Sequence, residues 1–592
     1  MKNKFLITSP LDRTWPKNKN SELVICSESA VLNFKKLQES YKYFTINKNK
    51  WENKKKLFKD YSYLESLYEK LLRQISHKLN EHHSIEENLE FWRILIGPWL
   101  GNFTHIFFER WQNIDSCIKK SNNIENISID FDYKDFIPYD HKEFVKYSNN
   151  DYWNQFIYQN ILGNISKKKN VLKIKKNLIY KDLKKNNLAL NFNEKKYTLI
   201  NLIKYLFDLI NKKDSRYFFY KTYLSLKDEL KLNLKFNQLP RLNIKKLNIK
   251  KKNINFIFRE KTKLTGLNKN KFEKLLNNIL FFQIPSVYLE DFDNLTLFKK
   301  NSKLPSNPKI IFTSNAAWFD SHIAYYIAKM KSKKTKVFYG QHGGNYAISK
   351  ILWPEKHEKK ISDKFLSWGW KEKGRKVIPL SKFKSFNVKK TTNDELLIML
   401  KHRQRYFFSM DSSGGTESFS SYLNYISVFL IKLNSPKRQK TILRLPNNND
   451  IKSFDIYSKL EKKFNFRTSN SPIDAFSKSK LIVHTLISTS INDALDANLP
   501  SIIIIRKDQN PFNVNAKKVF KMLHDANILF YDPIKAAKFV DTIWHNNRVE
   551  LWWNKKRTQD AVKIFCKYFA KDNKYLIQNL NKIFRERTNR SW

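Results

Sequence analysis

The stretch Lys336 to Asn345 reads KVFYGQHGGN and joins a strand-like apolar entry to a glycine-rich loop. Glycine is scarce elsewhere: the chain has 11 glycines in 592 residues, and seven of them lie between Gly340 and Gly415. Clustering of so few glycines indicates positive φ angles or close backbone approach. The loop with its embedded His342 is therefore a candidate phosphate or sugar site. The alternative is a tight turn around a hydrogen-bonded histidine.

The residues before this loop predict a strand at 309–314 (KIIFTS) and a helix at 315–331, which Asp320 or Ser321 is expected to cap. Together with a strand at 336–340 they form a βαβ unit. The glycine loop then lies beyond the carboxyl end of a parallel strand, which is where open α/β sheets bind ligands. Another strand is expected at 364–370.

A second α/β pattern follows a polar stretch at 374–394 that is typical of a linker. It predicts a helix at 419–433 and four apolar strands, at 395–402, 440–446, 481–485 and 501–505. Between the last two strands lies a helix that begins with Ser488, Thr489 and Ser490. Asp493 stands at capping-box spacing from Ser490. Three hydroxyls at the positive end of a helix predict a phosphate site, and an over-capped ordinary helix is the alternative.

The N-terminal part also reads as α/β, with strands at 4–8 and 22–26 and an amphipathic helix at 61–79. We therefore predict an α/β protein with two Rossmann-like domains that face each other across a cleft, the arrangement of GT-B glycosyltransferases. The first domain spans 1–373 with a helical insertion at about 140–280, and a linker spans 374–394. The second domain spans 395–545, and helices at 546–592 are expected to pack back.

Composition narrows the choice of partners. The net charge is +56, but the lysines are spread along the chain among asparagines, so we expect no nucleic-acid binding. Weak contact with an anionic membrane face or with phosphorylated substrates is expected instead. The three cysteines form no CxxC pair, so neither a metal site nor a disulfide framework is predicted. No signal peptide or transmembrane helix is expected, which fits a cytoplasmic protein.

Six segments carry a resemblance that spans nearly the whole chain. They are, in order, LITSPLDRTWP (6–16), WRILIGPWL (92–100), FTSNAAWFD (312–320), YGQHGGNY (339–346), FLSWGW (365–370) and STSINDALDANLP (488–500). The chain resembles a family of bacterial transferases associated with O-antigen and other surface-carbohydrate biosynthesis. The QHGG and STS segments are also similar in position to motifs of Kdo- and sialyltransferase-like GT-B enzymes and of polyol-phosphate polymerases.

The resemblance implies a donor phosphate held by Ser488, Thr489 and Ser490 and neutralised by Arg444. The strand of Arg444 ends in Arg-Leu-Pro, where related sugar transferases have a His-Pro pair. Asp493 stands where such families often have Glu, and it would bind a ribose or cap the helix.

On the side of the glycine loop, Gln341, Gly343 and Gly344 would contact the substrate. His342 would polarise the donor phosphate or act as general base. Asp320 and Glu290 are the rival bases, and Glu290 also fits as the cap of the following turn.

The predicted function is transfer of a glycosyl group from a nucleotide-activated donor to a glycan or lipid-linked precursor of a surface polysaccharide. The nucleotide sugar is a co-substrate, and no further cofactor and no metal are expected. The protein would work in the cytoplasm or peripherally at the inner face of the membrane. Two alternatives stay open: a basic protein that binds nucleic acid or an anionic surface, and a nucleotide-sugar epimerase.

Overall fold

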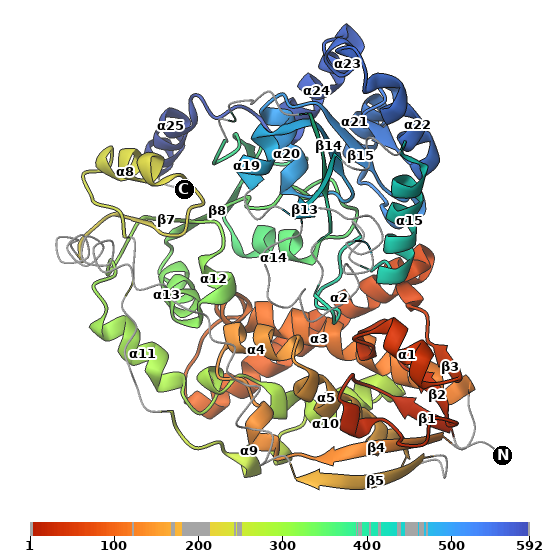
Figure 1. Cartoon of the computed structure of the whole chain (residues 1–592). Coiled ribbons are helices and arrows are strands. Elements are labelled where there is room, and N and C mark those ends of the chain that lie inside the picture. The colour runs from red at the N-terminus through yellow and green to blue at the C-terminus, as the bar shows by residue number, and fades with distance from the viewer. Residues whose placement is uncertain are drawn as a thin grey trace.

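The computed structural model describes residues 4–120, 124–166, 172–179, 213–241, 244, 251–385, 388, 394–401, 404–412, 416–434, 440–444, 460, 467–468 and 472–589. The predicted insertion at 140–280 and the predicted linker at 374–394 lie partly outside these residues, and Gly414 and Gly415 lie outside them. Within the described residues the strands form three sheets, and all strand pairs in them are parallel (Figure 1).

The N-terminal sheet lies at the lower right of Figure 1. Its strand order is β3 (Tyr43–Ile46), β2 (Glu22–Ile25), β1 (Lys4–Ile7), β4 (Ile124–Asp130) and β5 (Leu172–Ile179). The middle sheet has the order β10 (Val377–Pro379), β9 (Lys364–Ser367), β8 (Lys336–Gly340), β7 (Ile310–Thr313) and β6 (Tyr217–Phe219).

The C-terminal sheet has the order β13 (Arg467–Thr468), β12 (Thr441–Arg444), β11 (Glu395–Met399), β14 (Ser479–His484), β15 (Ser501–Ile504) and β16 (Leu529–Phe530). The chain starts in the centre of this sheet at β11, runs outward to β13, and returns to β14 on the other side of β11. This is the doubly wound Rossmann order, and its switch point lies between β11 and β14.

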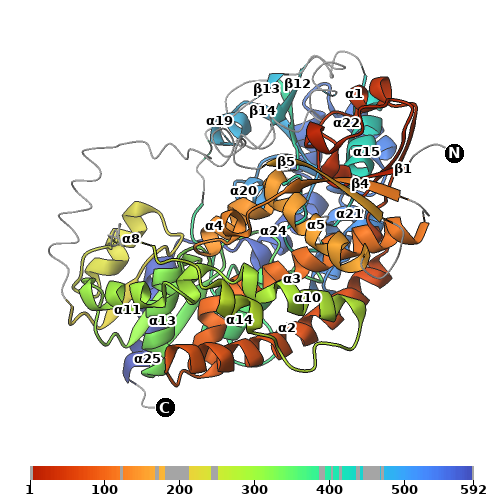
Figure 2. The ribbon, with the colours of Figure 1, turned by 90° about the horizontal axis from the view of Figure 1, so that it is seen from below.

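Helices connect and cover the sheets (Figures 1 and 2). In the first part of the chain they are α1 (Phe34–Ser40), α2 (Lys54–His83), α3 (Leu89–Lys120), α4 (His141–Ser148), α5 (Asp151–Ser166), α8 (Leu226–Leu234), α9 (Phe256–Lys261), α10 (Lys271–Gln283) and α11 (Phe292–Asn301). In the remainder they are α12 (Ala316–Phe319), α13 (Ser321–Ser332), α14 (Trp353–Ile361), α15 (Phe419–Lys432), α19 (Pro472–Ser477), α20 (Thr489–Asp496), α21 (Val514–Asp525), α22 (Pro533–Ile543), α23 (Arg548–Trp553), α24 (Lys556–Phe569) and α25 (Leu576–Asn589).

The α/β fold with Rossmann-like parallel sheets confirms the predicted fold class, and the predicted strands and helices of the second half are present. One difference is that residues up to 379 hold two sheets, where the sequence predicts a single α/β domain over 1–373. Strand β10 of the middle sheet lies inside the predicted linker at 374–394. The reason lies in the strands that were missed. The side chains of β3 alternate between exposed and half-buried, and β4 (IENISID) alternates apolar with polar residues, so neither gives a continuous apolar run.

Two packing features fix how the sheets sit relative to each other. Helix α3 is buried along most of its length and packs against α2, α5, α13 and α14. It therefore connects the helices of the N-terminal sheet with those of the middle sheet (Figure 2). At the other end of the chain, α25 lies on the middle sheet. Phe584 packs with its ring centroid 5.4 Å from that of Phe312 and 5.1 Å from that of Phe338.

Among the described residues, no helix combines the length and the apolar character needed to span a bilayer.

Candidate active site

The glycine-rich loop follows β8 at the carboxyl edge of the middle sheet. A Cβ atom on Gly340 would lie 2.2 Å from Phe383 Cε2 and 2.7 Å from Ser314 Oγ, and one on Gly344 would lie 2.6 Å from Thr489 Cα. A side chain at either position would displace its neighbours. Neither glycine has a positive φ angle. Close backbone approach therefore explains the clustering of glycine in this loop.

Gly344 joins the loop to the first turn of α20. Its backbone N–H donates a hydrogen bond of 3.1 Å to Thr489 Oγ1. Helix α20 follows β14, next to the switch point of the C-terminal sheet. Open α/β sheets bind ligands at such a point, outside the carboxyl ends of the strands. The fold thus brings two predicted motifs, 145 residues apart in the sequence, into contact where a ligand site is expected.

The start of α20 carries a chain of polar side chains. Ser488 Oγ lies 2.8 Å from Ser490 Oγ, which lies 3.2 Å from Nδ1 of His484. Burial lowers the pKa of His484 to about 3, so its ring is neutral at pH 7. Ser488 is the N-cap residue, and its side chain makes no capping hydrogen bond within the described part of the chain. The side chain of Ser488 therefore caps none of the N–H groups of the first turn, of which that of Ile491 donates to the Ser488 carbonyl oxygen at 3.1 Å.

Asp493 does not form the capping box that its spacing suggested. Its Oδ1 accepts from Nζ of Lys382 at 2.9 Å, and the same ammonium group lies 2.8 Å from Oδ2 of Asp496. Burial raises the pKa of Asp493, and the charge of Lys382 works against that rise. Lys382 itself is fully buried. This ion-pair cluster fastens α20 to the segment after β10, so Asp493 is engaged inside the protein.

His342 belongs to a buried polar group with Glu358 of α14 and Tyr346. Nε2 of His342 lies 2.8 Å from Glu358 Oε1 and 3.0 Å from the hydroxyl of Tyr346, which donates to Glu358 Oε2 at 2.9 Å. Burial lowers the pKa of His342, but the charge of Glu358 outweighs it, and the pKa is raised above 6.5. Because a carboxylate only accepts, Nε2 carries the proton and Nδ1 the lone pair of the neutral ring.

Tyr223 is a neighbour of His342 that the sequence did not reveal. Its ring centroid lies 5.9 Å from that of His342, and 46% of the residue is exposed. Tyr223 and Lys221 both have left-handed backbone, with φ angles of 69° and 48°. Non-glycine residues held in this region cluster at functional sites. The two residues follow β6, a three-residue strand near the lysine-rich part of the sequence, which obscured the signal.

Gln341 and Gly343 hold the shape of the loop. Gln341 is buried, and its Oε1 accepts from the backbone N–H of Trp368 at 2.9 Å and from Nε1 of Trp370 at 2.8 Å. Its Nε2 donates to the carbonyl oxygen of Gly343 at 2.7 Å. Gln341 therefore links the YGQHGGNY and FLSWGW segments and positions His342 from behind.

Arg444 ends β12 at the carboxyl edge of the C-terminal sheet. Across β11, Met399 pairs in register with Arg444 on one side and with His484 on the other. Arg444 is thus level with the strand end that leads into α20. Its buried Nε has no hydrogen-bond partner among the described residues, and burial lowers the pKa of the guanidinium. Arginine nevertheless stays charged in proteins.

The two rival carboxylates are occupied elsewhere. Asp320 caps α13 by accepting from the backbone N–H groups of His322 at 3.1 Å and Ile323 at 3.3 Å. Glu290 is buried in a bidentate pair with Arg259, with contacts of 2.7 and 2.6 Å. In the part of the chain that the structure describes, no cluster of three or more His, Cys, Asp or Glu is arranged to hold a metal ion.

Comparisons with solved structures find similar chains at low identity. The spinosyn rhamnosyltransferase SpnG, complexed with spinosyn aglycone, is 10% identical over 51% of this chain and 76% of that chain, with a TM-score of 0.29. MnaA of S. aureus with UDP is 9% identical over 51% and 80%, with a TM-score of 0.32. WaaG, a glycosyltransferase involved in lipopolysaccharide biosynthesis, is 9% identical over 50% and 95%, with a TM-score of 0.27.

A search of curated proteins gives no match. A family model matches nearly the whole sequence, over residues 4–584, and its description is LIC12162 family transferase. The match includes the glycine-rich loop, α14 and the start of α20. The chain therefore belongs to the LIC12162 family of transferases.

Proposed function

We propose that this transferase moves a glycosyl group from a nucleotide-activated donor to a hydroxyl group of a glycan or lipid-linked acceptor. The observation that carries the proposal is the 3.1 Å hydrogen bond from Gly344 N–H to Thr489 Oγ1. It joins a histidine loop on one Rossmann-like sheet to an uncapped helix start on another. A base on one side and a phosphate site on the other are what glycosyl transfer from a nucleotide sugar needs.

The donor phosphate would bind at the first turn of α20. The hydroxyl of Thr489 accepts from Gly344 and still has its own proton to donate. Ser488 and Ser490 add two more hydroxyls, and the helix dipole favours an anion. His484 is neutral there, so the positive charge must come from elsewhere. Arg444, level with His484 on the other side of β11, is the cation we propose.

His342 would act as general base through Nδ1. Glu358 holds the proton of the neutral ring at Nε2 and raises the pKa of His342, which makes it a stronger base. In the reaction the acceptor hydroxyl gives its proton to Nδ1, and its oxygen forms a bond to the anomeric carbon of the donor. The bond from that carbon to the phosphate oxygen breaks, and the leaving phosphate keeps the electron pair beside Arg444 and α20. No metal ion is needed in this scheme.

The motif resemblance to surface-carbohydrate transferases supports a polysaccharide precursor as acceptor. The net charge of +56 favours contact with an anionic membrane face, where a lipid-linked acceptor would be presented at the cytoplasmic side.

A panel of nucleotide sugars tests the proposal. The midpoint temperature of thermal unfolding of the full chain should rise with a subset of nucleotides, because a ligand that binds only the folded state stabilises it. The matching nucleotide sugars should be hydrolysed slowly and transferred to an added acceptor. Absence of any shift, hydrolysis or transfer across UDP-, GDP-, CMP- and dTDP-activated sugars would reject a nucleotide-sugar donor.

A further inference from the structure

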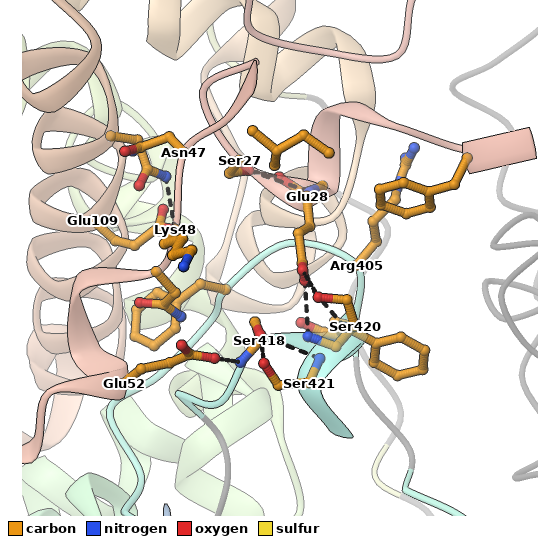
Figure 3. A pocket seen from close by; sticks show the side chains of 18 residues that line it. Ser27, Glu28, Asn47, Lys48, Glu52, Glu109, Arg405, Ser418, Ser420 and Ser421 are labelled. Carbon is orange, nitrogen blue, oxygen red and sulfur yellow. Dashed lines mark hydrogen bonds between the residues drawn. The ribbon is translucent and has the colours of Figure 1, made fainter. Parts of the chain in front are cut away.

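A cavity of about 320 Å³ lies between the N-terminal part of the chain and the start of α15 (Figure 3). The loops after β2 and β3 form one wall with Ser27, Glu28 and Asn47. The start of α15 forms another with Ser418 and Ser420. Its volume falls in the range of small-molecule sites, which is about 300–1,000 Å³.

Carboxylates from the N-terminal part of the chain already accept hydrogen bonds from the backbone N–H groups at the start of α15. Glu28 Oε2 accepts from the backbone N–H of Phe419 at 2.8 Å, and Glu28 also accepts from the hydroxyl of Ser420. Glu52 Oε1 accepts from the backbone N–H of Ser418 at 3.0 Å. Figure 3 shows both carboxylates directed at the helix start. The positive end of this helix therefore does not offer a free anion site.

The charge of the lining also disfavours an anion. The whole chain has 111 Lys and Arg residues against 55 Asp and Glu. The cavity reverses this ratio, with Glu28, Glu52 and Glu109 against Lys48 and Arg405. Arg405 is paired with Asp151 and Glu109 with Arg110, so Glu28 and Glu52 remain against Lys48. A phosphate would meet more negative than positive charge here.

The remaining lining suits a sugar. It combines amide and hydroxyl groups with aromatic rings, among them Asn49, Asn113, Phe34 and Phe407. The hydroxyl groups of a sugar both donate and accept hydrogen bonds, and the C–H face of its ring is apolar. A neutral saccharide therefore matches carboxylates, amides and ring faces at once.

We propose that this cavity binds a neutral saccharide unit. The assignment deepens the proposed function, and rests on it in one respect: the unit would belong to the glycan acceptor, held away from the reacting hydroxyl. Glu28 and Glu52 would each use remaining lone pairs to accept from sugar hydroxyls. The cavity would thus select the acceptor, whereas α20 binds the donor.

Saturation-transfer NMR on the full chain tests this, with a panel of neutral mono- and disaccharides and with inorganic phosphate as the anionic probe. Glu28→Gln keeps an oxygen that can cap Phe419 but loses the charge. It should weaken saccharide binding about fivefold, the difference between a charged and a neutral hydrogen bond. The matched control is Glu39→Gln, on the exposed face of α1, which should change nothing.

Three results would overturn the proposal. The first is that no saccharide binds. The second is that binding is equal in the wild type, Glu28→Gln and Phe34→Ala proteins. The third is that Glu28→Gln tightens phosphate binding, which would make the cavity an anion site. Nucleotide-induced thermal shifts are measured on the same variants. Shifts that stay normal while saccharide binding fails would reject the cavity assignment alone, and the reverse pattern would reject the donor site alone.

Discussion

The first turns of α20 and α15 lie near the same edge of the C-terminal sheet, yet different chemical groups contact their N–H groups and side chains. At α20 the partner is the backbone of Gly344, and the N-cap residue makes no side-chain capping bond within the described residues. At α15 the Ser418 side chain accepts from the N–H of Ser421, and Glu28 and Glu52 occupy the N–H groups before it.

This difference assigns different ligands to the two helix starts. A helix start whose N–H groups already hold carboxylates has little left for a phosphate, whereas one met by hydroxyls and a glycine backbone keeps its positive end unneutralised. The two helix starts also differ in how closely the neighbouring segment packs against them. The contact at α20 is so close that a Cβ on Gly344 would overlap it, whereas the contact at α15 leaves a cavity of about 320 Å³.

The largest effect should come from His342. His342→Ala removes the proposed base at the α20 side, and we expect transfer to fall about 10²- to 10⁴-fold. Saccharide binding at the α15 side should not change. The control is His524→Ala, because His524 is an exposed histidine on α21. A wild-type transfer rate in the His342→Ala protein would remove His342 from the chemistry.

Gly344→Ala should have the next largest effect. The new methyl group would lie 2.2 Å from Asn492 Oδ1 and must push the loop away from α20. We expect a loss of about 1–3 kcal/mol in the free energy of unfolding, typical of overpacking, and weaker nucleotide binding. Gly163→Ala is the matched control, since a Cβ at Gly163 meets nothing within 4 Å. Chemical denaturation and nucleotide titration measure both, and equal behaviour of the two variants would contradict the close contact.

Arg444→Ala tests the cation proposed for the donor phosphate. Loss of a charge-assisted hydrogen bond costs about 1.5–3 kcal/mol, so nucleotide affinity should fall about 10- to 100-fold. Lys48→Ala removes a positive charge from the α15 cavity instead and should leave nucleotide affinity unchanged. Isothermal titration calorimetry with the nucleotide measures the affinity of both variants. If Lys48→Ala has the larger effect, the donor binds at α15.

The smallest effect is expected in the pH dependence of the transfer rate. The wild-type rate should fall as the pH drops through the pKa of His342, which lies above 6.5 because of Glu358. Glu358→Gln removes the charge that raises this pKa, while burial still lowers it, so the acid limb of the rate profile should move to lower pH. A rate that rises as the pH falls would indicate that the charged imidazolium binds phosphate.

The same pair links stability to pH. Since the pKa of His342 is raised in the folded state, the stabilisation by Glu358 is complete below 6.5 and is lost as the pH rises through the folded-state pKa. The difference in unfolding free energy between wild type and Glu358→Gln should therefore shrink in that direction. Denaturation series at several pH values would measure it, and a difference that grew with pH would reverse the sign of the coupling.

The sequence was informative where residue use was unusual. The glycine cluster predicted close backbone approach, and β8 begins and ends at the predicted residues 336 and 340. The apolar strands of the C-terminal sheet were also predictable, because they are buried and read as continuous runs. Motif order along the chain then suggested that the loop and α20 face each other.

Other features depend on tertiary contacts that no local pattern encodes. Glu358 lies 16 residues after His342 in an ordinary helical segment, and only folding brings its carboxylate to the imidazole. Glu28 caps a helix 391 residues further along the chain. Tyr223 follows a three-residue strand near lysine-rich sequence. A weak signal existed for Glu28, since polar Ser-Glu-Ser follows the predicted strand at 22–26.

The most direct test of the central claim is a crystal structure of the chain with the nucleoside diphosphate or monophosphate that gives the largest thermal shift. Our account predicts that the phosphate lies within hydrogen-bonding distance of the backbone N–H groups and hydroxyls of Thr489 and Ser490, with His342 facing it across the contact. A phosphate bound instead in the cavity at the start of α15, beside Glu28 and Ser420, would contradict it.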